Sequence, residues 1–110
     1  MEERRLFRRS EISCNITIIP AFKIVAFNGR LENISEGGIR IVLREKLDIG
    51  TQLDLEISPQ DENKSITCKG KVIWVNEKST DERDLSFDTG IKFVNINEED
   101  RAKIRSEWSI

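Results

Sequence analysis

Histidine and tyrosine are both absent from this chain of 110 residues. Without histidine, Ser-His-Asp and Cys-His catalytic arrangements are excluded, and the commonest general base and metal ligand of proteins is missing. The carboxylates are numerous, but they are scattered along polar faces, which is typical of solvated surface. The inventory therefore favours a binding domain, with no catalytic residue, no metal site and no cofactor, over a hydrolase or a transferase.

Long hydrophobic runs are also lacking, and cysteine is scarce. No apolar run approaches the length of a membrane span, and the first residues are charged, unlike a signal peptide. These absences predict a cytoplasmic protein that does not insert into a membrane. Cys14 and Cys68 lie far apart and form no CxxC motif. We expect both to be reduced and buried in the core.

The composition that remains is that of one globular domain spanning residues 1–110, with a net charge of −2. One basic cluster stands out from this acidic balance. It is the stretch "RRLFRR", which contains Arg4, Arg5, Phe7, Arg8 and Arg9. Such a cluster calls for an anionic partner, but it is too short for duplex DNA, which needs a basic face across the domain. A small phosphorylated ligand is the better expectation, rather than a nucleic acid polymer.

Alternating polar and apolar residues predict a series of short antiparallel strands. The strand segments are 14–19, 22–27, 29–34, 39–43, 53–57, 65–75 and 90–94. Asn28-Gly29 and Gly70 are expected at bulges or bends, and the polar segment 76–84 is expected to form a loop.

After the last predicted strand the period changes to that of a helix. Asn97 is a candidate N-cap, and three acidic residues follow it in the first turn. Ile104 and Trp108 are four residues apart and share a face. The predicted fold is therefore mainly β: a six-stranded antiparallel β-barrel over residues 12–96, a short C-terminal α-helix over 97–109, and a flexible N-terminal arm over 1–11.

A second informative stretch, "ENISEGGIRI", occupies residues 32–41. Asn33 and Ser35 carry short hydrogen-bonding side chains, and the adjacent Gly37 and Gly38 allow positive φ angles and leave no Cβ in the way of a ligand. One interpretation is simply a tight turn between two strands. The other is a ligand-binding turn.

The two stretches together resemble the PilZ domain, a family of bacterial receptors for cyclic di-GMP. The family motifs are RxxxR on an N-terminal arm and [D/N]xSxxG between two barrel strands. The first is matched by Arg5 and Arg9, and the second by Asn33, Ser35 and Gly38. The later stretches "GKVIWV" and "TGIKFVNINEEDRAKI" resemble the family as well, so that the resemblance covers essentially the whole chain.

The resemblance implies a PilZ-like split barrel that binds cyclic di-GMP, a second messenger, without catalysis. Arg5 and Arg9 would use their planar forks on guanine edges and phosphates, which lysine cannot do. Asn33 and Ser35 would hydrogen-bond the ligand, and Gly37 and Gly38 would let the backbone approach it. An arginine directly before RxxxR, here Arg4, implies binding of two intercalated ligand molecules. Alternatively, Arg4 and Arg8 only add long-range attraction.

The signalling mechanism expected from this site is an ordering of the arm. Ligand would give the arginines partners, and the repositioned arm would alter a surface that an effector protein contacts. We expect a monomer or a weak homodimer. One alternative is a PilZ-like interaction adaptor that binds no nucleotide. A β-barrel for single-stranded nucleic acid is disfavoured by the net charge and by only 6% aromatic residues, most of them at core-facing positions.

Overall fold

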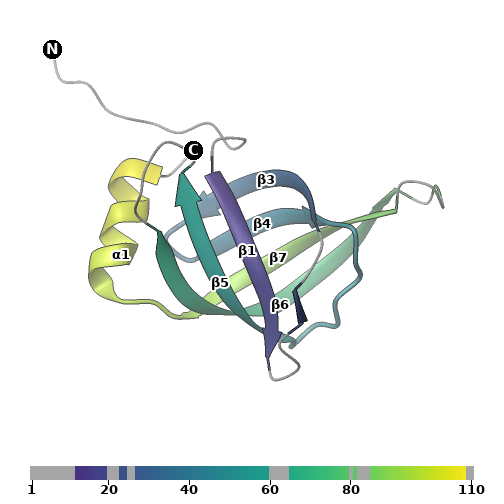
Figure 1. Cartoon of the computed structure of the whole chain (residues 1–110), viewed down its shortest axis with the longest axis horizontal. Coiled ribbons are helices and arrows are strands. Elements are labelled where there is room, and N and C mark those ends of the chain that lie inside the picture. The colour runs from purple at the N-terminus through teal and green to yellow at the C-terminus, as the bar shows by residue number, and fades with distance from the viewer. Residues whose placement is uncertain are drawn as a thin grey trace, which may run out of the picture.

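The computed structural model describes residues 12–19, 23–24, 27–59, 65–79, 81 and 85–108, and the predicted arm over residues 1–11 lies outside them. Seven strands are followed by a helix and a π-helical turn (Figure 1). The strands are β1 (Ile12–Ile19), β2 (Lys23–Ile24), β3 (Phe27–Ser35), β4 (Gly38–Leu43), β5 (Gln52–Pro59), β6 (Ile66–Ser79) and β7 (Ser86–Asn95). The helical elements are α1 (Glu98–Lys103) and η2 (Ile104–Trp108).

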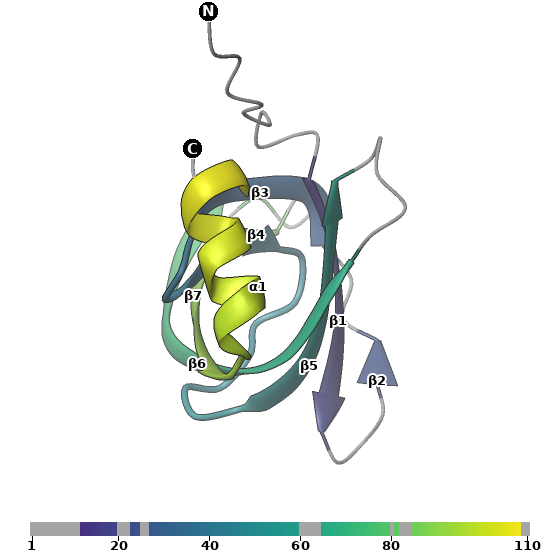
Figure 2. The ribbon, with the colours of Figure 1, turned by 90° about the vertical axis from the view of Figure 1, so that its left-hand side faces the viewer.

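The strands form one antiparallel sheet in the order β2-β1-β5-β6-β7-β4-β3. Six strands have six residues or more, and β2 has two. The sheet is strongly curved (Figure 2). The mainly β, antiparallel prediction is therefore confirmed. Among the described residues, no pairing joins the two edge strands β2 and β3, so the strand pairings do not close the sheet into the predicted barrel.

The core lies on the inner side of this curved sheet. Alternate residues of each long strand point inward because successive side chains of a strand face opposite sides. They form one buried cluster that draws on all six long strands and on Ile104 of η2, which has no exposed surface. Cys14 and Cys68 are both free thiols inside this cluster, as predicted.

The helix begins where the sequence predicts it. Asn97 is its N-cap, and its side-chain Oδ1 accepts a hydrogen bond of 2.8 Å from the backbone N–H of Asp100. The helix lies across one end of the curved sheet (Figure 2), where Ile104 enters the core. The predicted C-terminal helix is present, but regular α-helix ends at Lys103 and a π-helical turn continues the segment to Trp108. No helix of the described residues is long and apolar enough to cross a membrane.

The loop predicted over 76–84 is wrong for residues 76–79, which belong to the β6–β7 hairpin, whereas residues 80 and 82–84 lie outside the described residues. β6 continues to Ser79, and Asn76 and Ser79 pair with Asp88 and Ser86 of β7. This polar part of the hairpin projects away from the rest of the sheet (Figure 1). Backbone pairing continues there beyond the core, where no apolar face is required, so that the sequence carries no alternation to reveal it.

Candidate ligand-binding site

The stretch "NISEGG" forms a tight hairpin turn between β3 and β4. Ser35 pairs with Gly38, and the backbone N–H of Gly37 donates to the Ser35 Oγ at 3.3 Å. The carbonyl oxygen of Gly37 accepts a hydrogen bond of 2.9 Å from the N–H of Phe93 in β7. Both interpretations of this stretch require a turn, which the structure shows, and β7 holds that turn in place.

The turn residues form one side of a hollow of about 320 Å³ on the outer face of the sheet. All four site residues predicted in this stretch line it: Asn33, Ser35, Gly37 and Gly38. The other lining residues are Ile39, Arg40, Ile73, Trp74, Gly90 and Ile91. The structure thus brings the second motif together at one concave site. Arg4, Arg5, Phe7 and Arg9 lie outside the described residues.

A row of residues crosses four neighbouring strands at this hollow. Asn33 of β3 pairs with Arg40 of β4, Arg40 with Gly90 of β7, and Gly90 with Trp74 of β6. A Cβ on Gly90 would lie within 3.0 Å of the Trp74 indole, so the ring occupies the space that a side chain would need. Gly90 therefore positions an aromatic ring beside the motif.

The two glycines of the turn differ in their surroundings. A Cβ on Gly38 would collide with the backbone carbonyl oxygen of Ile91, whereas a Cβ on Gly37 would approach only the Ser35 Oγ, at 3.9 Å. Neither residue has a φ angle between +20° and +160°. Close packing of β4 on β7, rather than a left-handed backbone, thus explains why position 38 requires glycine.

Arg40 is a charged residue of the hollow that the sequence motifs do not include. Its Nε lies 3.0 and 3.1 Å from the two carboxylate oxygens of Asp88, and its Nη2 lies 2.6 Å from Oδ2. The hydrogen bonds and the charge of Asp88 raise the pKa of Arg40. Asp88 is largely buried, with 13% of its side chain exposed, while the Arg40 side chain is 51% exposed. The fork is thus anchored by one carboxylate at the edge of the hollow.

A second ion pair connects the motif turn to the C-terminal helical segment. Glu36, at the tip of the turn, accepts a hydrogen bond from Arg105 Nε of η2. Arg105 Nη2 also lies 3.5 Å from a carboxylate oxygen of Glu98 in α1. Glu36, through its hydrogen bond and its charge, raises the pKa of Arg105. The turn and the helical segment are therefore in direct side-chain contact.

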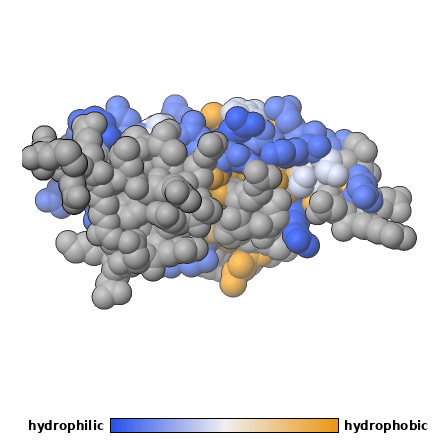
Figure 3. Space-filling model, turned by 90° about the horizontal axis from the view of Figure 1, so that it is seen from above, coloured by the Kyte–Doolittle hydropathy of each residue, from blue (hydrophilic) through white to orange (hydrophobic). Residues whose placement is uncertain are grey.

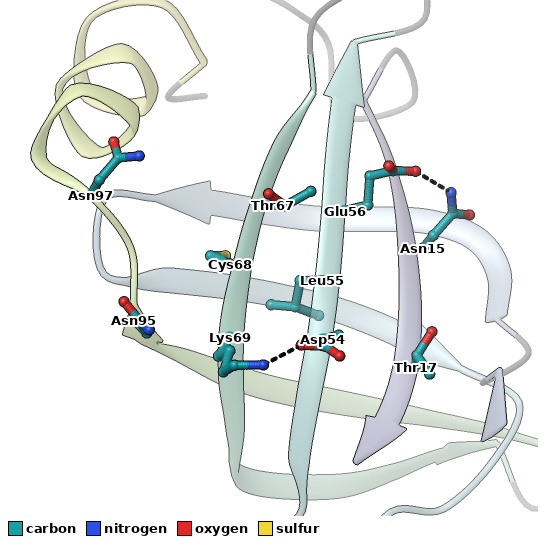
Figure 4. A pocket seen from close by; sticks show the side chains of 10 residues that line it. All are labelled: Asn15, Thr17, Asp54, Leu55, Glu56, Thr67, Cys68, Lys69, Asn95 and Asn97. Carbon is teal, nitrogen blue, oxygen red and sulfur yellow. Dashed lines mark hydrogen bonds and ion pairs between the residues drawn. The ribbon is translucent and has the colours of Figure 1, made fainter. Parts of the chain in front are cut away.

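A larger hollow of about 560 Å³ lies over β1, β5 and β6 (Figure 4). Several of its polar groups bind one another, since Asn15 donates to Glu56 at 3.0 Å and Lys69 donates to Asp54 at 2.8 Å. Burial, and then the charge of Asp100, raises the pKa of the Cys68 thiol in this hollow to about 11. The thiol is therefore protonated near neutral pH and is a poor nucleophile.

The described residues present a mainly polar surface on one face of the molecule. From above, the coloured part of the surface is mostly hydrophilic, with small separate hydrophobic patches (Figure 3). Among these residues, no group of three or more His, Cys, Asp or Glu side chains lies close enough together to hold a metal ion.

The sequence motifs do not identify Trp74 and Arg40 as site residues, and the reason differs between the two. Strict alternation from the inward-facing Val72 predicts that Trp74 also faces the core, where most aromatic side chains are expected. A register shift between Val72 and Trp74 puts the indole on the outer face instead. Arg40 alternates with the apolar residues of "IRIVL", so the sequence does indicate that its side chain faces outward. Its carboxylate partner is 48 residues away and carries no local signal.

Fold and site together define a small antiparallel β-domain with a polar turn at the rim of a ligand-sized hollow. The family model described as "PilZ domain" matches residues 3–107, and the chain belongs to that family. Among solved structures, the fold is similar to that described as "Structure of Bacillus subtilis Inhibitor of motility (MotI/DgrA)". That match has a TM-score of 0.57 and 20% identity, and covers 83% of this chain and 44% of the other. The chain thus spans less than half of that protein. No curated protein matches the chain.

Proposed function

We propose that this chain is a non-catalytic receptor for cyclic di-GMP. The observation that carries the proposal is the hollow beside the β3–β4 turn, where Asn33, Ser35 and the two glycines of the second motif meet Trp74. The motif is local in the sequence, and membership of the PilZ family supports the same ligand.

The side chains of the hollow suit a guanine nucleotide. The Trp74 indole offers a base a stacking surface, and stacking contributes about 1–3 kcal/mol per base. The Asn33 amide both donates and accepts hydrogen bonds, and the Ser35 hydroxyl does so too, so that they fit a guanine edge or a phosphate. Arg40 is held by Asp88 and is half-exposed at the rim, where its remaining N–H groups can donate to the ligand.

The arm would supply the rest of the site. A hollow of about 320 Å³ is at the lower end of the range for small-molecule sites, and cyclic di-GMP has two guanines and two phosphates. Arg5 and Arg9 would enclose the part that the hollow leaves exposed, and Arg4 would favour an intercalated pair of ligands. In this proposal the repositioned arm presents a new surface to an effector protein.

We further infer the setting in which this receptor works. The curved sheet closes as a split barrel over residues 12–96, which the single core shared by all six long strands supports. The chain acts as one domain in the cytoplasm, as a monomer or weak homodimer, and signals through a protein partner.

Calorimetric titration of cyclic di-GMP into the whole protein tests the proposal. We expect binding in the wild type, with a loss of at least about tenfold in affinity for Ser35→Ala and for the double variant Arg5→Ala, Arg9→Ala. The matched control is Arg44→Ala, Arg101→Ala, which removes the same charge elsewhere and should bind like the wild type. A stoichiometry near two would support the part proposed for Arg4.

Two results would contradict the receptor proposal. If folded wild-type protein gives no heat with cyclic di-GMP at micromolar concentration, the receptor proposal is wrong. The chain would then be the nucleotide-free interaction adaptor. Binding of a single-stranded oligonucleotide in preference to cyclic di-GMP would also contradict the proposal.

A further inference from the structure

A second row of residues crosses the same four strands next to the first. Ser35 of β3 pairs with Gly38 of β4, Gly38 with Lys92 of β7, and Lys92 with Lys71 of β6. Figure 1 shows β3, β4 and β7 side by side in this part of the sheet. Ser35 and Gly38 also line the hollow. The row therefore begins inside the proposed ligand site and ends at two lysines.

Lys71 of β6 and Lys92 of β7 differ from the other lysines of these two strands. Lys69 and Lys78 each donate to a carboxylate, at 2.8 and 3.3 Å. Lys71 and Lys92 are both exposed, and within the described part of the chain neither has an ion pair or a side-chain hydrogen bond. They lie directly opposite each other, and like charges in that arrangement destabilise a sheet.

The gap between Ser35 and Lys92 has the width that a phosphate needs. Directly paired residues are roughly 5 Å apart, so Ser35 and Lys92, with one strand between them, are separated by roughly 10 Å. The residue between them is Gly38, which places no side chain there. An anion lying over Gly38 can thus accept hydrogen bonds from a hydroxyl on one side and an ammonium on the other.

We propose that Lys92 and Lys71 form the anion-binding end of the site and hold a phosphate of the ligand over Gly38. This inference rests on the proposed function and deepens it, because it assigns phosphate recognition to the sheet as well as to the arm. The anion relieves the repulsion between the two ammonium groups, and Lys92, the nearer to Ser35, is the principal contact.

Single substitutions measured by calorimetry with cyclic di-GMP test this inference. We expect Lys92→Gln to weaken binding about five- to tenfold and Lys71→Gln about threefold, while Lys92→Arg, which keeps the charge, stays within about threefold of the wild type. The matched control is Lys46→Gln. Lys46 is exposed in the segment after β4, at the opposite end of that strand from the turn, and should bind like the wild type.

Thermal unfolding without ligand separates this role from a structural one. Removing one of two opposed positive charges should leave the unfolding midpoint of Lys92→Gln unchanged or raise it, while ligand binding weakens. If the wild type binds but Lys92→Gln binds as tightly as Lys46→Gln, the lysine site is wrong and the receptor proposal stands. If the wild type does not bind at all, both are wrong.

Discussion

Trp74 lies directly opposite Gly90 in the β6–β7 pairing, and its indole fills the space that any side chain at position 90 would need. Because the ring also lines the hollow, one glycine links the stability of the sheet to the shape of the site.

The first prediction concerns that pair. Gly90→Ala should force the Trp74 ring to move and lower the free energy of unfolding by about 1–3 kcal/mol, the usual cost of overpacking. Urea unfolding followed by tryptophan fluorescence measures both effects. Gly37→Ala is the matched control, since its methyl group meets only the Ser35 Oγ at 3.9 Å, and it should stay within about 0.5 kcal/mol of the wild type. Equal destabilisation of the two variants would contradict the prediction.

The second prediction concerns Gly38, the final residue of the motif. A methyl group there would collide with the backbone of β7, which cannot rotate away as a side chain can. Gly38→Ala should therefore cost about 3 kcal/mol or more and weaken the pairing of β4 with β7. Amide hydrogen exchange at Ile91 and Lys92 should rise with it. Loss of ligand binding with normal protection of these amides would show instead that Gly38 acts only through the ligand.

The sequence predicts the inward faces of the strands well, and the site only in part. Leu53, Leu55 and Ile57 alternate because one face of β5 is buried, and burial is what the pattern records. The same logic fails at Trp74, where a register shift after Val72 exchanges the faces. A bulge is set by how neighbouring strands pair, which no local pattern contains.

Long-range pairs set the second limit on prediction from sequence. The contact between Glu36 and Arg105 joins residues 69 apart in the sequence. Neither charged residue by itself indicates that it has a partner. The motif around Asn33 could be found because its chemistry is local. The lysine row could not, since it depends on the order of four strands.

The third prediction is an alkaline loss of stability from Cys68. In the unfolded chain its thiol ionises near its ordinary pKa of 9.0, whereas burial raises the pKa in the folded chain to about 11. Above pH 9.0 the folded state thus binds more protons than the unfolded state, and stability falls as pH rises. The loss is about 1.4 kcal/mol per pH unit at most and ends near the folded pKa. Below pH 8 it should be absent.

Urea midpoints measured between pH 7 and 11 test this, with Cys68→Ala as the comparison. Its baseline stability will differ because of the smaller side chain, so the slope against pH is the quantity to compare. The variant should show a shallower alkaline slope. Burial also raises the pKa of Cys14, and this cause remains when Cys68 is replaced, so a smaller fall should persist in the variant. Identical slopes in the two proteins would contradict the assignment to Cys68.

The last prediction tests the fork between Arg40 and Asp88. Arg40→Ala leaves a largely buried carboxylate without its partner, and Arg40→Lys restores the charge but not the two parallel hydrogen bonds. We expect urea midpoints in the order wild type, Arg40→Lys, Arg40→Ala. The control is Lys69→Ala, which breaks the exposed pair with Asp54 and should cost less than about 1 kcal/mol. If Arg40→Ala is no less stable than Lys69→Ala, the fork does not hold β4 against β7. Any effect of Arg40 on binding would then be due to direct contact between its side chain and the ligand.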